Sequence, residues 1–544
     1  MSYSIVVDDV TFSWADGTPV LQGLNAAFPA GRTGLIGLNG AGKSTLLKII
    51  AGQLRPVSGS VSVAGEVGYL PQHVPVAGSV ADLLGITPIR RALHAIEQGS
   101  VDEADYAAVG DDWDVEERAQ AELAMLGLGH LGLDRPATTL SGGEAVLVAL
   151  GAQILRRPDV LLLDEPTNNL DLDARRRLYA VVEAWRGVMV VVSHDRVLLD
   201  LVDQIADLRG GSIRLFGGPL SAYTEALESE QESAERLVRT AGADVRRQQR
   251  ELIEARTKLA RRSRTGEKQA TGMPKIVAGA RKRAAQVTAG KTLGLHQDKL
   301  EEARDRLEEA EQAVRDDAEI RVDLPETAVP AGRTVLTLRV ASEPDGDEHA
   351  AEDEPGDEPG DELGDEEAPR LYLDELVIRG PERIALTGPN GSGKTTLLKR
   401  IVEQGAQVPL RYLPQRLDLL DPELSVLDNL RAMAPAAPIN ELRARLARFL
   451  FRGERALRPA GTLSGGERFR ASLAALLSAD PAPQLLLLDE PTNNLDMASV
   501  RQLSQALAGY RGALIVVSHD EPFLESLGIT RTLVQDREKG LSVT

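Results

Sequence analysis

The sequence contains no cysteine, and only 3% of its residues are aromatic. The missing thiols exclude cysteine nucleophiles, disulfides and cysteine-ligated zinc or iron–sulfur centres, and they fit a reducing compartment. The scarcity of rings argues against stacking as the main mode of recognition. No uninterrupted apolar run approaches the roughly 18 residues of a membrane span, and the first ten residues do not resemble a signal peptide. We therefore expect a cytoplasmic protein.

The formal net charge of −20 is unevenly distributed. Glu343–Glu367 contains 14 acidic and no basic residues, whereas Arg236–Lys291 contains 16 basic and 4 acidic residues. The basic segment keeps nucleic acid among the candidate partners of an acidic chain. The acidic stretch is too polar to order itself, so we expect a disordered insert over 341–369. It is either a solvated spacer or an autoinhibitory segment that competes with RNA for the basic segment.

Five motifs occur twice, in the same order. In the first half they are GLNGAGKST (Gly37–Thr45), YLPQ (Tyr69–Gln72), LSGGE (Leu140–Glu144), LLLDEPTNNLD (Leu161–Asp171) and VVSHD (Val191–Asp195). In the second half they are GPNGSGKTT (Gly388–Thr396), YLPQ (Tyr412–Gln415), LSGGE (Leu463–Glu467), LLLDEPTNNLD (Leu486–Asp496) and VVSHD (Val516–Asp520). The repetition predicts two α/β domains, over 1–220 and 330–544, joined by a linker over 221–325.

The first motif of each half is a phosphate loop. Its glycines let backbone N–H groups surround phosphates, and the following helix directs its positive end at them. Lys43 and Lys394 are expected to reach the β- and γ-phosphates, and Ser44 and Thr395 to ligate Mg²⁺. The candidate nucleotide-binding residues of these loops are Gly37, Asn39, Gly40, Gly42, Lys43, Ser44, Thr45, Gly388, Asn390, Gly391, Gly393, Lys394, Thr395 and Thr396.

In both halves an apolar run ends in two adjacent carboxylates, as in a buried parallel strand that leads to a metal site. Asp164 and Asp489 are expected to hold the Mg²⁺ shell. Glu165 and Glu490 are the candidates for orienting or deprotonating an attacking water. The alternative is a capped strand end with exposed acids. The LSGGE motif allows a helix cap or an anion site offered to the nucleotide of the other domain, through Ser141, Gly142, Gly143, Ser464, Gly465 and Gly466.

These motifs in this order resemble the ATP-binding cassette superfamily. The resemblance implies two P-loop NTPase domains packed head to tail, with Lys43 sharing an ATP with Ser464, and Lys394 with Ser141. It also implies Gln72 and Gln415 as ligands near Mg²⁺ and water, Asp171 and Asp496 as D-loop aspartates, and His194 and His519 as switch histidines that touch the γ-phosphate. Glutamate and histidine are 29 residues apart in both halves. Trp14 occupies the place of an adenine-stacking aromatic, for which the second half has no equivalent.

The linker contains two apolar seams with spacings of three and four, Val238–Leu259 and Leu293–Val314. Glycines and a proline within Ser263–Gly294 indicate a turn, so we predict an antiparallel helical hairpin whose first arm, 221–262, is about 60 Å long. Its tip, Lys258–Lys291, has ten basic residues and one acid. We expect the tip to contact RNA phosphates rather than to be purely structural, through Arg261, Arg262, Arg264, Lys268, Lys275, Arg281, Lys282, Arg283 and Lys291.

Twin cassettes, a basic hairpin and no membrane segment resemble the ABC-F proteins. This implies an Mg²⁺-dependent ATPase with no other metal, a monomer whose cassettes pair intramolecularly. Its implied partner is the ribosome, at the tRNA exit site, with the linker near the P-site tRNA and the 23S rRNA of the peptidyl-transferase centre. The role is antibiotic protection or that of a translation factor. The alternatives are the ATPase subunit of a transporter, which has no evident use for a basic hairpin, and a DNA-repair cassette ATPase, which commonly carries its coil inside one cassette.

Overall fold

The computed structural model describes residues 5–168, 170–269, 294–309, 324–339, 375–415, 419–493, 495–536 and 540–543. The acidic insert 341–369 lies outside the described residues. Contacts divide the chain into a larger unit, Met1–Leu220 with Glu319–Thr544, and a smaller one, Ser221–Ala318. Within the part that the structure describes, no helix has the length and apolar content needed to cross a bilayer.

The first cassette is built on a six-stranded sheet with the order β5-β6-β7-β3-β8-β9, in which β9 alone is antiparallel to its neighbour. An antiparallel sheet, β2-β1-β4, accompanies it. Every residue of β6 and β7 is buried, as strands covered on both faces require. The strands are β1 (Ile5–Ser13), β2 (Pro19–Phe28), β3 (Gly31–Gly37), β4 (Ser58–Val63), β5 (Val67–Leu70), β6 (Val160–Asp164), β7 (Val188–Val192), β8 (Gln204–Arg209) and β9 (Ser212–Gly217).

The second cassette repeats this plan with the order β13-β14-β15-β12-β16-β17 and a two-stranded sheet, β10-β11. Because β14 and β15 are also buried at every residue, the duplicated sequence forms a duplicated core. Two tandem α/β cassettes, as predicted, are confirmed. The strands are β10 (Thr334–Arg339), β11 (Glu375–Arg379), β12 (Arg383–Thr387), β13 (Leu410–Leu413), β14 (Leu485–Asp489), β15 (Ala513–Val517), β16 (Arg531–Asp536) and β17 (Gly540–Val543).

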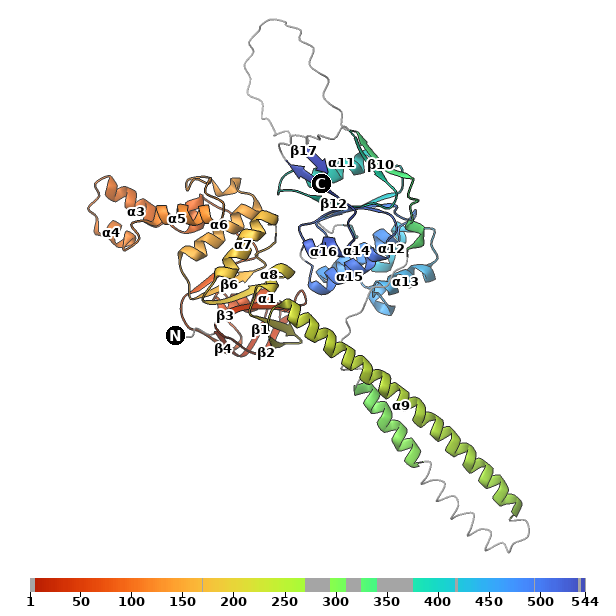
Figure 1. Cartoon of the computed structure of the whole chain (residues 1–544). Helices are drawn as coiled ribbons and strands as arrows, with labels where there is room; N and C mark the ends of the chain where they lie inside the picture. Colours follow the sequence, from red (N-terminus) through yellow and green to blue (C-terminus); the bar gives the residue numbers. More distant parts are fainter. Residues whose placement is uncertain are drawn as a thin grey trace, which may run out of the picture. The chain divides into compact units, whose positions relative to one another are not determined.

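The helices of the two cassettes correspond, with one local difference. The lysine of the phosphate loop and the serine of LSGGE are 98 residues apart in the first half and 70 in the second. Helices α3 and α4 account for the excess, and Figure 1 shows them in orange with α5 at one side of the first cassette. The helices are α1 (Lys43–Ile50), α2 (Val80–Leu84), α3 (Thr87–Glu97), α4 (Glu103–Val109), α5 (Val115–Met125), α6 (Gly142–Leu155), α7 (Leu172–Ala184), α8 (Arg196–Asp200), α11 (Lys394–Gln404), α12 (Val426–Met433), α13 (Ile439–Arg448), α14 (Gly465–Leu477), α15 (Met497–Ala508) and α16 (Glu521–Ser526).

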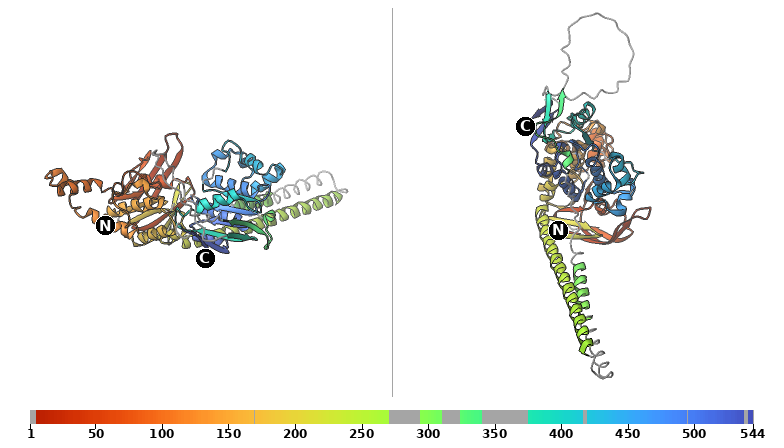
Figure 2. Two further views of the ribbon diagram at one scale, coloured as in Figure 1. Left: turned by 90° about the horizontal axis from the view of Figure 1, so that it is seen from above. Right: turned by 90° about the vertical axis from the view of Figure 1, so that its right-hand side faces the viewer.

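The smaller unit is a helical hairpin. Helix α9 (Leu220–Gln269) has 50 residues, and a second helix covers 294–309 beside it (Figures 1 and 2). Arg306 of the second helix lies 3.8 Å from Asp244 of the first, and Leu252, Leu300 and Ala303 are buried on the predicted seams. The helix continues seven residues beyond the expected break at 262, because one glycine in a helix costs only about 1 kcal/mol.

Candidate functional site

The two phosphate loops follow the carboxyl ends of β3 and β12, and each leads into a helix. Gly42 precedes α1 with φ +98° and Gly393 precedes α11 with φ +91°, a backbone conformation that favours glycine. The buried Lys43 donates hydrogen bonds from Nζ to the carbonyls of Gly37 (2.8 Å) and Leu38 (3.1 Å). Lys394 makes the matching bonds in the second loop. Burial lowers the pKa of both lysines. Each loop thus holds a buried ammonium among main-chain groups, an arrangement suited to phosphate.

The aspartates that end β6 and β14 are buried beside the phosphate loops. Ser44 donates from Oγ to Asp164 Oδ1 at 2.9 Å, and Tyr69 donates to Asp164 Oδ2 at 3.3 Å. In the second cassette Tyr412 donates to Asp489 Oδ2 at 3.1 Å, whereas Thr395 is exposed. Burial raises the pKa of Asp164. Hydroxyl and carboxylate oxygens of this kind are the ligands that Mg²⁺ prefers.

The glutamates that follow these aspartates share an unusual backbone. Glu165 has φ +50° and Glu490 has φ +45°, in the left-handed region that costs a residue with a side chain free energy. A backbone hydrogen bond to the neighbouring strand fixes each, from Glu165 N–H to Val192 and from Glu490 N–H to Val517. Burial raises the pKa of Glu165 against the opposing charge of Lys43, and it raises the pKa of Glu490 to about 7. Raised pKa values suit bases that work near neutral pH.

Each glutamate faces the histidine that follows the next strand. Nε2 of His194 lies 3.2 Å from Oε1 of Glu165, and Nε2 of His519 lies 3.4 Å from Oε1 of Glu490. Neither pair of atoms is oriented to form a hydrogen bond. Both ring nitrogens of each histidine are therefore buried without a hydrogen-bond partner among the described residues. Burial lowers the pKa of both rings to about 3. Two neutral imidazoles with unsatisfied nitrogens fit sites that a polar ligand completes.

Two aspartates link the cassettes reciprocally. Asp171 Oδ2 accepts a hydrogen bond from the backbone N–H of Asn390 at 3.3 Å, and Asp496 Oδ2 accepts one from Asn39 at 3.2 Å. The other carboxylate oxygen caps the aspartate's own helix, through the N–H of Ala174 in α7 and of Ser499 in α15. Each aspartate therefore connects the start of a helix in one cassette to the phosphate loop of the other.

The LSGGE serines both cap helices. Ser141 and Glu144 form a reciprocal capping box at the start of α6, and Ser464 and Glu467 form one at the start of α14. Ser141, Gly142, Ser464 and Gly465 are exposed, and Gly143 and Gly466 are buried. The helix-cap interpretation is therefore correct, and the exposed start of each helix remains accessible to an anion.

The other predicted contacts lie near the edges of this arrangement. Trp14 follows β1, 45% exposed, with its ring edge-to-face against Phe12 at 5.1 Å. Gln72 is half-buried after β5, and Gln415 is exposed after β13. Of the predicted RNA contacts, Arg261 is exposed on α9, and Arg262, Arg264 and Lys268 belong to the same helix. Lys275, Arg281, Lys282, Arg283 and Lys291 lie outside the described residues.

Two kinds of contact were not predicted. The tyrosines of the repeated YLPQ motif bond the strand-end aspartates, and their recurrence in both halves was the available signal. Arg175 in α7 contacts the second cassette at His519, 344 positions away. The sequence indicates this contact only by a difference between the two halves: the position in α15 that matches Arg175 is Val500.

Known proteins resemble the chain over nearly its full length. A family model described as "ABC transporter" matches residues 21–168 and 402–493. The tylosin resistance ATP-binding protein TlrC of Streptomyces fradiae is 35% identical, covering 95% of both chains. The energy-dependent translational throttle protein EttA of Mycobacterium tuberculosis is 31% identical, covering 96% of this chain and 87% of its own length. ABC transporter F family member 5 of Arabidopsis thaliana is 30% identical over 91% of this chain and 70% of its own length.

A solved structure shares the fold. The archaeal ribosome recycling factor aABCE1, crystallised with a ribosomal stalk protein, aligns with a TM-score of 0.52 and 21% identity, covering 98% of this chain and 89% of its own. These features define a twin-cassette, ATP-binding protein. The chain belongs to the ABC-F family of ATP-binding cassette proteins, and it is an ATPase.

Proposed function

We propose that two ATP molecules bind between the cassettes, each held by the phosphate loop of one and the LSGGE motif of the other. The reciprocal contacts of Asp171 with Asn390 and of Asp496 with Asn39 support this pairing, because each joins the D-loop of one cassette to the phosphate loop of the other. Lys43 would share its nucleotide with Ser464, and Lys394 with Ser141. Trp14 would stack on the adenine of the first site, because its ring is 45% exposed although one edge packs against Phe12.

The strand-end aspartates and loop hydroxyls form the proposed Mg²⁺ positions: Ser44, Gln72 and Asp164 in the first site, and Thr395, Gln415 and Asp489 in the second. The described residues contain no cluster of three His, Cys, Asp or Glu that could hold a metal alone. Donor sets this small fit Mg²⁺, which commonly completes its shell with water and substrate phosphates. When bound, the ion would neutralise phosphate charge.

The buried glutamates are the proposed bases of hydrolysis. In its ionised form Glu490, or Glu165 in the first site, would orient a water and accept its proton. His519 and His194 stay neutral at physiological pH, so each can donate one N–H to a phosphate oxygen without a second buried charge. Phosphoryl transfer depends on such positioning more than on covalent chemistry.

We infer that the partner is the ribosome and that the protein acts on translation in the cytoplasm. The single observation that carries this is full-length similarity to a translational throttle protein and to a tylosin resistance protein. The proposed contact is the tRNA exit site, with the basic hairpin directed to the P-site tRNA and the 23S rRNA near the peptidyl-transferase centre. A basic surface recognises RNA chiefly through phosphates, so binding should weaken steeply with salt.

Co-sedimentation with ribosomes tests this proposal. The double variant Glu165→Gln, Glu490→Gln should pellet with ribosomes in ATP but not in ADP, because it binds ATP without consuming it. Replacing Arg281, Lys282 and Arg283 by Glu should reduce the fraction of protein that pellets with ribosomes. It should also make that fraction less dependent on salt concentration. The matched control reverses Arg246, Arg247 and Arg250 on α9, the same charge change away from the tip. Binding to duplex DNA or membranes in place of ribosomes would contradict the proposal.

The two proposed roles in translation predict different effects on drug susceptibility. Antibiotic resistance has the stronger support, since the resistance protein is 35% identical and covers 95% of both chains. A translation-factor role is favoured by the throttle protein at 31%. Expression in a susceptible host should raise the minimum inhibitory concentrations of macrolides or lincosamides if the first role holds. Unchanged concentrations together with altered translation rates would favour the second.

A further inference from the structure

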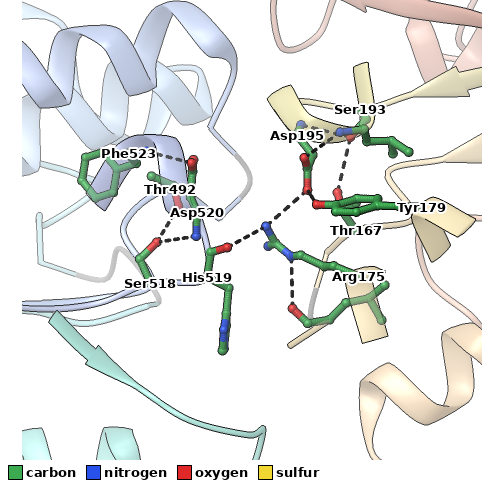
Figure 3. A network of polar contacts seen from close by, with 12 residues as sticks. Thr167, Arg175, Tyr179, Ser193, Asp195, Thr492, Ser518, His519, Asp520 and Phe523 are labelled. Atoms are coloured by element: carbon green, nitrogen blue, oxygen red, sulfur yellow. Dashed lines mark hydrogen bonds and ion pairs between the residues drawn. The ribbon is translucent and has the colours of Figure 1, made fainter. Parts of the chain in front are cut away.

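Arg175 joins three backbone or side-chain groups that belong to different loops. Its Nε donates to the carbonyl of Leu170, just before the D-loop aspartate of its own cassette, at 3.2 Å. Its Nη1 donates to Asp195 Oδ2 at 3.3 Å and to the backbone carbonyl of His519, in the second cassette, at 3.2 Å. Figure 3 shows the guanidinium between Asp195 on one side and His519 on the other. The side chain is 12% exposed, so these contacts are largely shielded from solvent.

The surroundings of Arg175 hold it in this position. Tyr179, one turn further along α7, donates to the same Asp195 Oδ2 at 2.7 Å. The other oxygen of Asp195 caps α8 through the N–H of Leu198. Asp195 is itself only 6% exposed. The acceptor is therefore fixed from two sides, and the planar guanidinium has little freedom to leave the His519 carbonyl.

The second cassette has no arginine at the position from which α15 would make the reverse contact, to His194. Counted from the D-loop aspartate, Arg175 corresponds to Val500 in α15, a residue only 5% exposed, and Tyr179 corresponds to Ser504. A valine has no side-chain donor, so position 500 cannot make the bond to His194 that Arg175 makes to His519. The two cassettes therefore share their motifs but not this arginine.

We propose that Arg175 is a positioning residue for the second ATP site, and that it couples closure of that site to the loops of the first cassette. The inference rests on the proposed function, which assigns His519 and Glu490 to this site. By holding the His519 carbonyl, Arg175 orients the backbone that carries the switch imidazole. Since the same guanidinium bonds Leu170 and Asp195, the imidazole takes its place only when the first cassette is docked. At the corresponding position beside the first site stands Val500, which cannot form this bond.

Vanadate trapping of a photoreactive 8-azido-ATP tests the proposal site by site. The full-length protein hydrolyses the analogue, vanadate holds the product, light fixes it, and trypsin cleavage in the basic hairpin separates the cassettes. Arg175→Met should reduce the nucleotide label in the second cassette by about tenfold or more, as loss of a charge-assisted hydrogen bond predicts. The label in the first cassette should stay unchanged. Arg175→Lys should restore part of the label in the second cassette. Arg176→Met is the control, because that neighbouring arginine is 69% exposed.

Equal loss of label from both cassettes, or no loss from either, would overturn the proposal, as would an Arg175→Lys variant that restores no label in the second cassette. Circular dichroism and the melting temperature of Arg175→Met show whether the variant is folded, and Arg175→Lys supplies the answer if it is not. Absence of trapping in both cassettes of the wild-type protein would refute the proposed function itself.

Discussion

Asp171 and Asn390 are 219 positions apart, and a 3.3 Å hydrogen bond from the Asn390 backbone to the Asp171 carboxylate joins them. The opposite pair, Asp496 and Asn39, is joined in the same way at 3.2 Å. Each carboxylate caps its own helix and also binds the phosphate loop of the other cassette. The second bond can form only when the two cassettes are docked.

Asp171→Ala removes both bonds at once. Loss of the α7 cap should lower the free energy of unfolding by about 1 kcal/mol, and loss of the contact to Asn390 should reduce ATP turnover by about fivefold to tenfold. Melting temperature and steady-state ATPase rates measure the two effects. Asp102→Ala is the matched control, because Asp102 caps α4 only; it should lose stability and keep its turnover. Equal turnover in the two variants would contradict this prediction.

The rate of hydrolysis should depend on the ionisation of the buried glutamates. Burial raises the pKa of Glu490 to about 7 and the pKa of Glu165 to about 8. A base must be deprotonated to accept a proton, so turnover should increase with pH up to about 7 in the second site and about 8 in the first, and fall about tenfold for each unit below. Turnover measured at saturating ATP from pH 5 to 9 checks this. A rate that stays constant down to pH 5 would rule out these carboxylates as bases.

The same raised pKa predicts how Glu490→Gln changes stability. The folded-state pKa of about 7 exceeds the ordinary value of 4.5, so the native protein binds the proton more tightly than the unfolded chain. Stability of the wild type should therefore fall as pH rises from 4.5 to 7 and stay low above it. A neutral glutamine avoids this loss. We expect the variant to melt higher than wild type at pH 8 and at a similar temperature at pH 4.5, whereas the exposed Glu403→Gln should show no such difference.

The apolar seam of the hairpin contains a buried polar atom that accepts no hydrogen bond from the described residues. Oε1 of Gln248 is buried without a hydrogen-bond partner among the described residues, on the seam that also carries the buried Leu252. Gln248→Leu should stabilise the hairpin by about 1 kcal/mol, since an unsatisfied buried acceptor is removed and apolar area is added. Hydrogen exchange along α9 should slow accordingly. Gln249→Leu, on the exposed face, should change exchange little; a similar effect of both variants would indicate a general gain in helicity.

The fold and its phosphate loops were accessible from sequence because they depend on local patterns. Apolar runs such as Leu161–Asp164 predict buried strands, and the glycines of Gly37–Thr45 predict the loop. The contact of Arg175 with His519 depends instead on how two helices from different cassettes meet, and no spacing rule connects residues 344 positions apart. The sequence also predicts too short a first arm for the hairpin: Gly266 indicates a break, whereas the neighbouring helix formers outweigh one glycine and α9 extends to Gln269.

The left-handed backbone of Glu165 and Glu490 has a consequence for evolution and design. A glycine would adopt these dihedral angles without strain and would avoid a buried carboxylate, so selection for folding alone would remove both acids. Their presence in both halves fits a trade-off in which the protein keeps a less stable turn because the proposed hydrolysis needs an acid there. Consensus stabilisation of this chain should therefore leave these two positions unchanged, since the replacement expected to stabilise the turn most would also remove the proposed base.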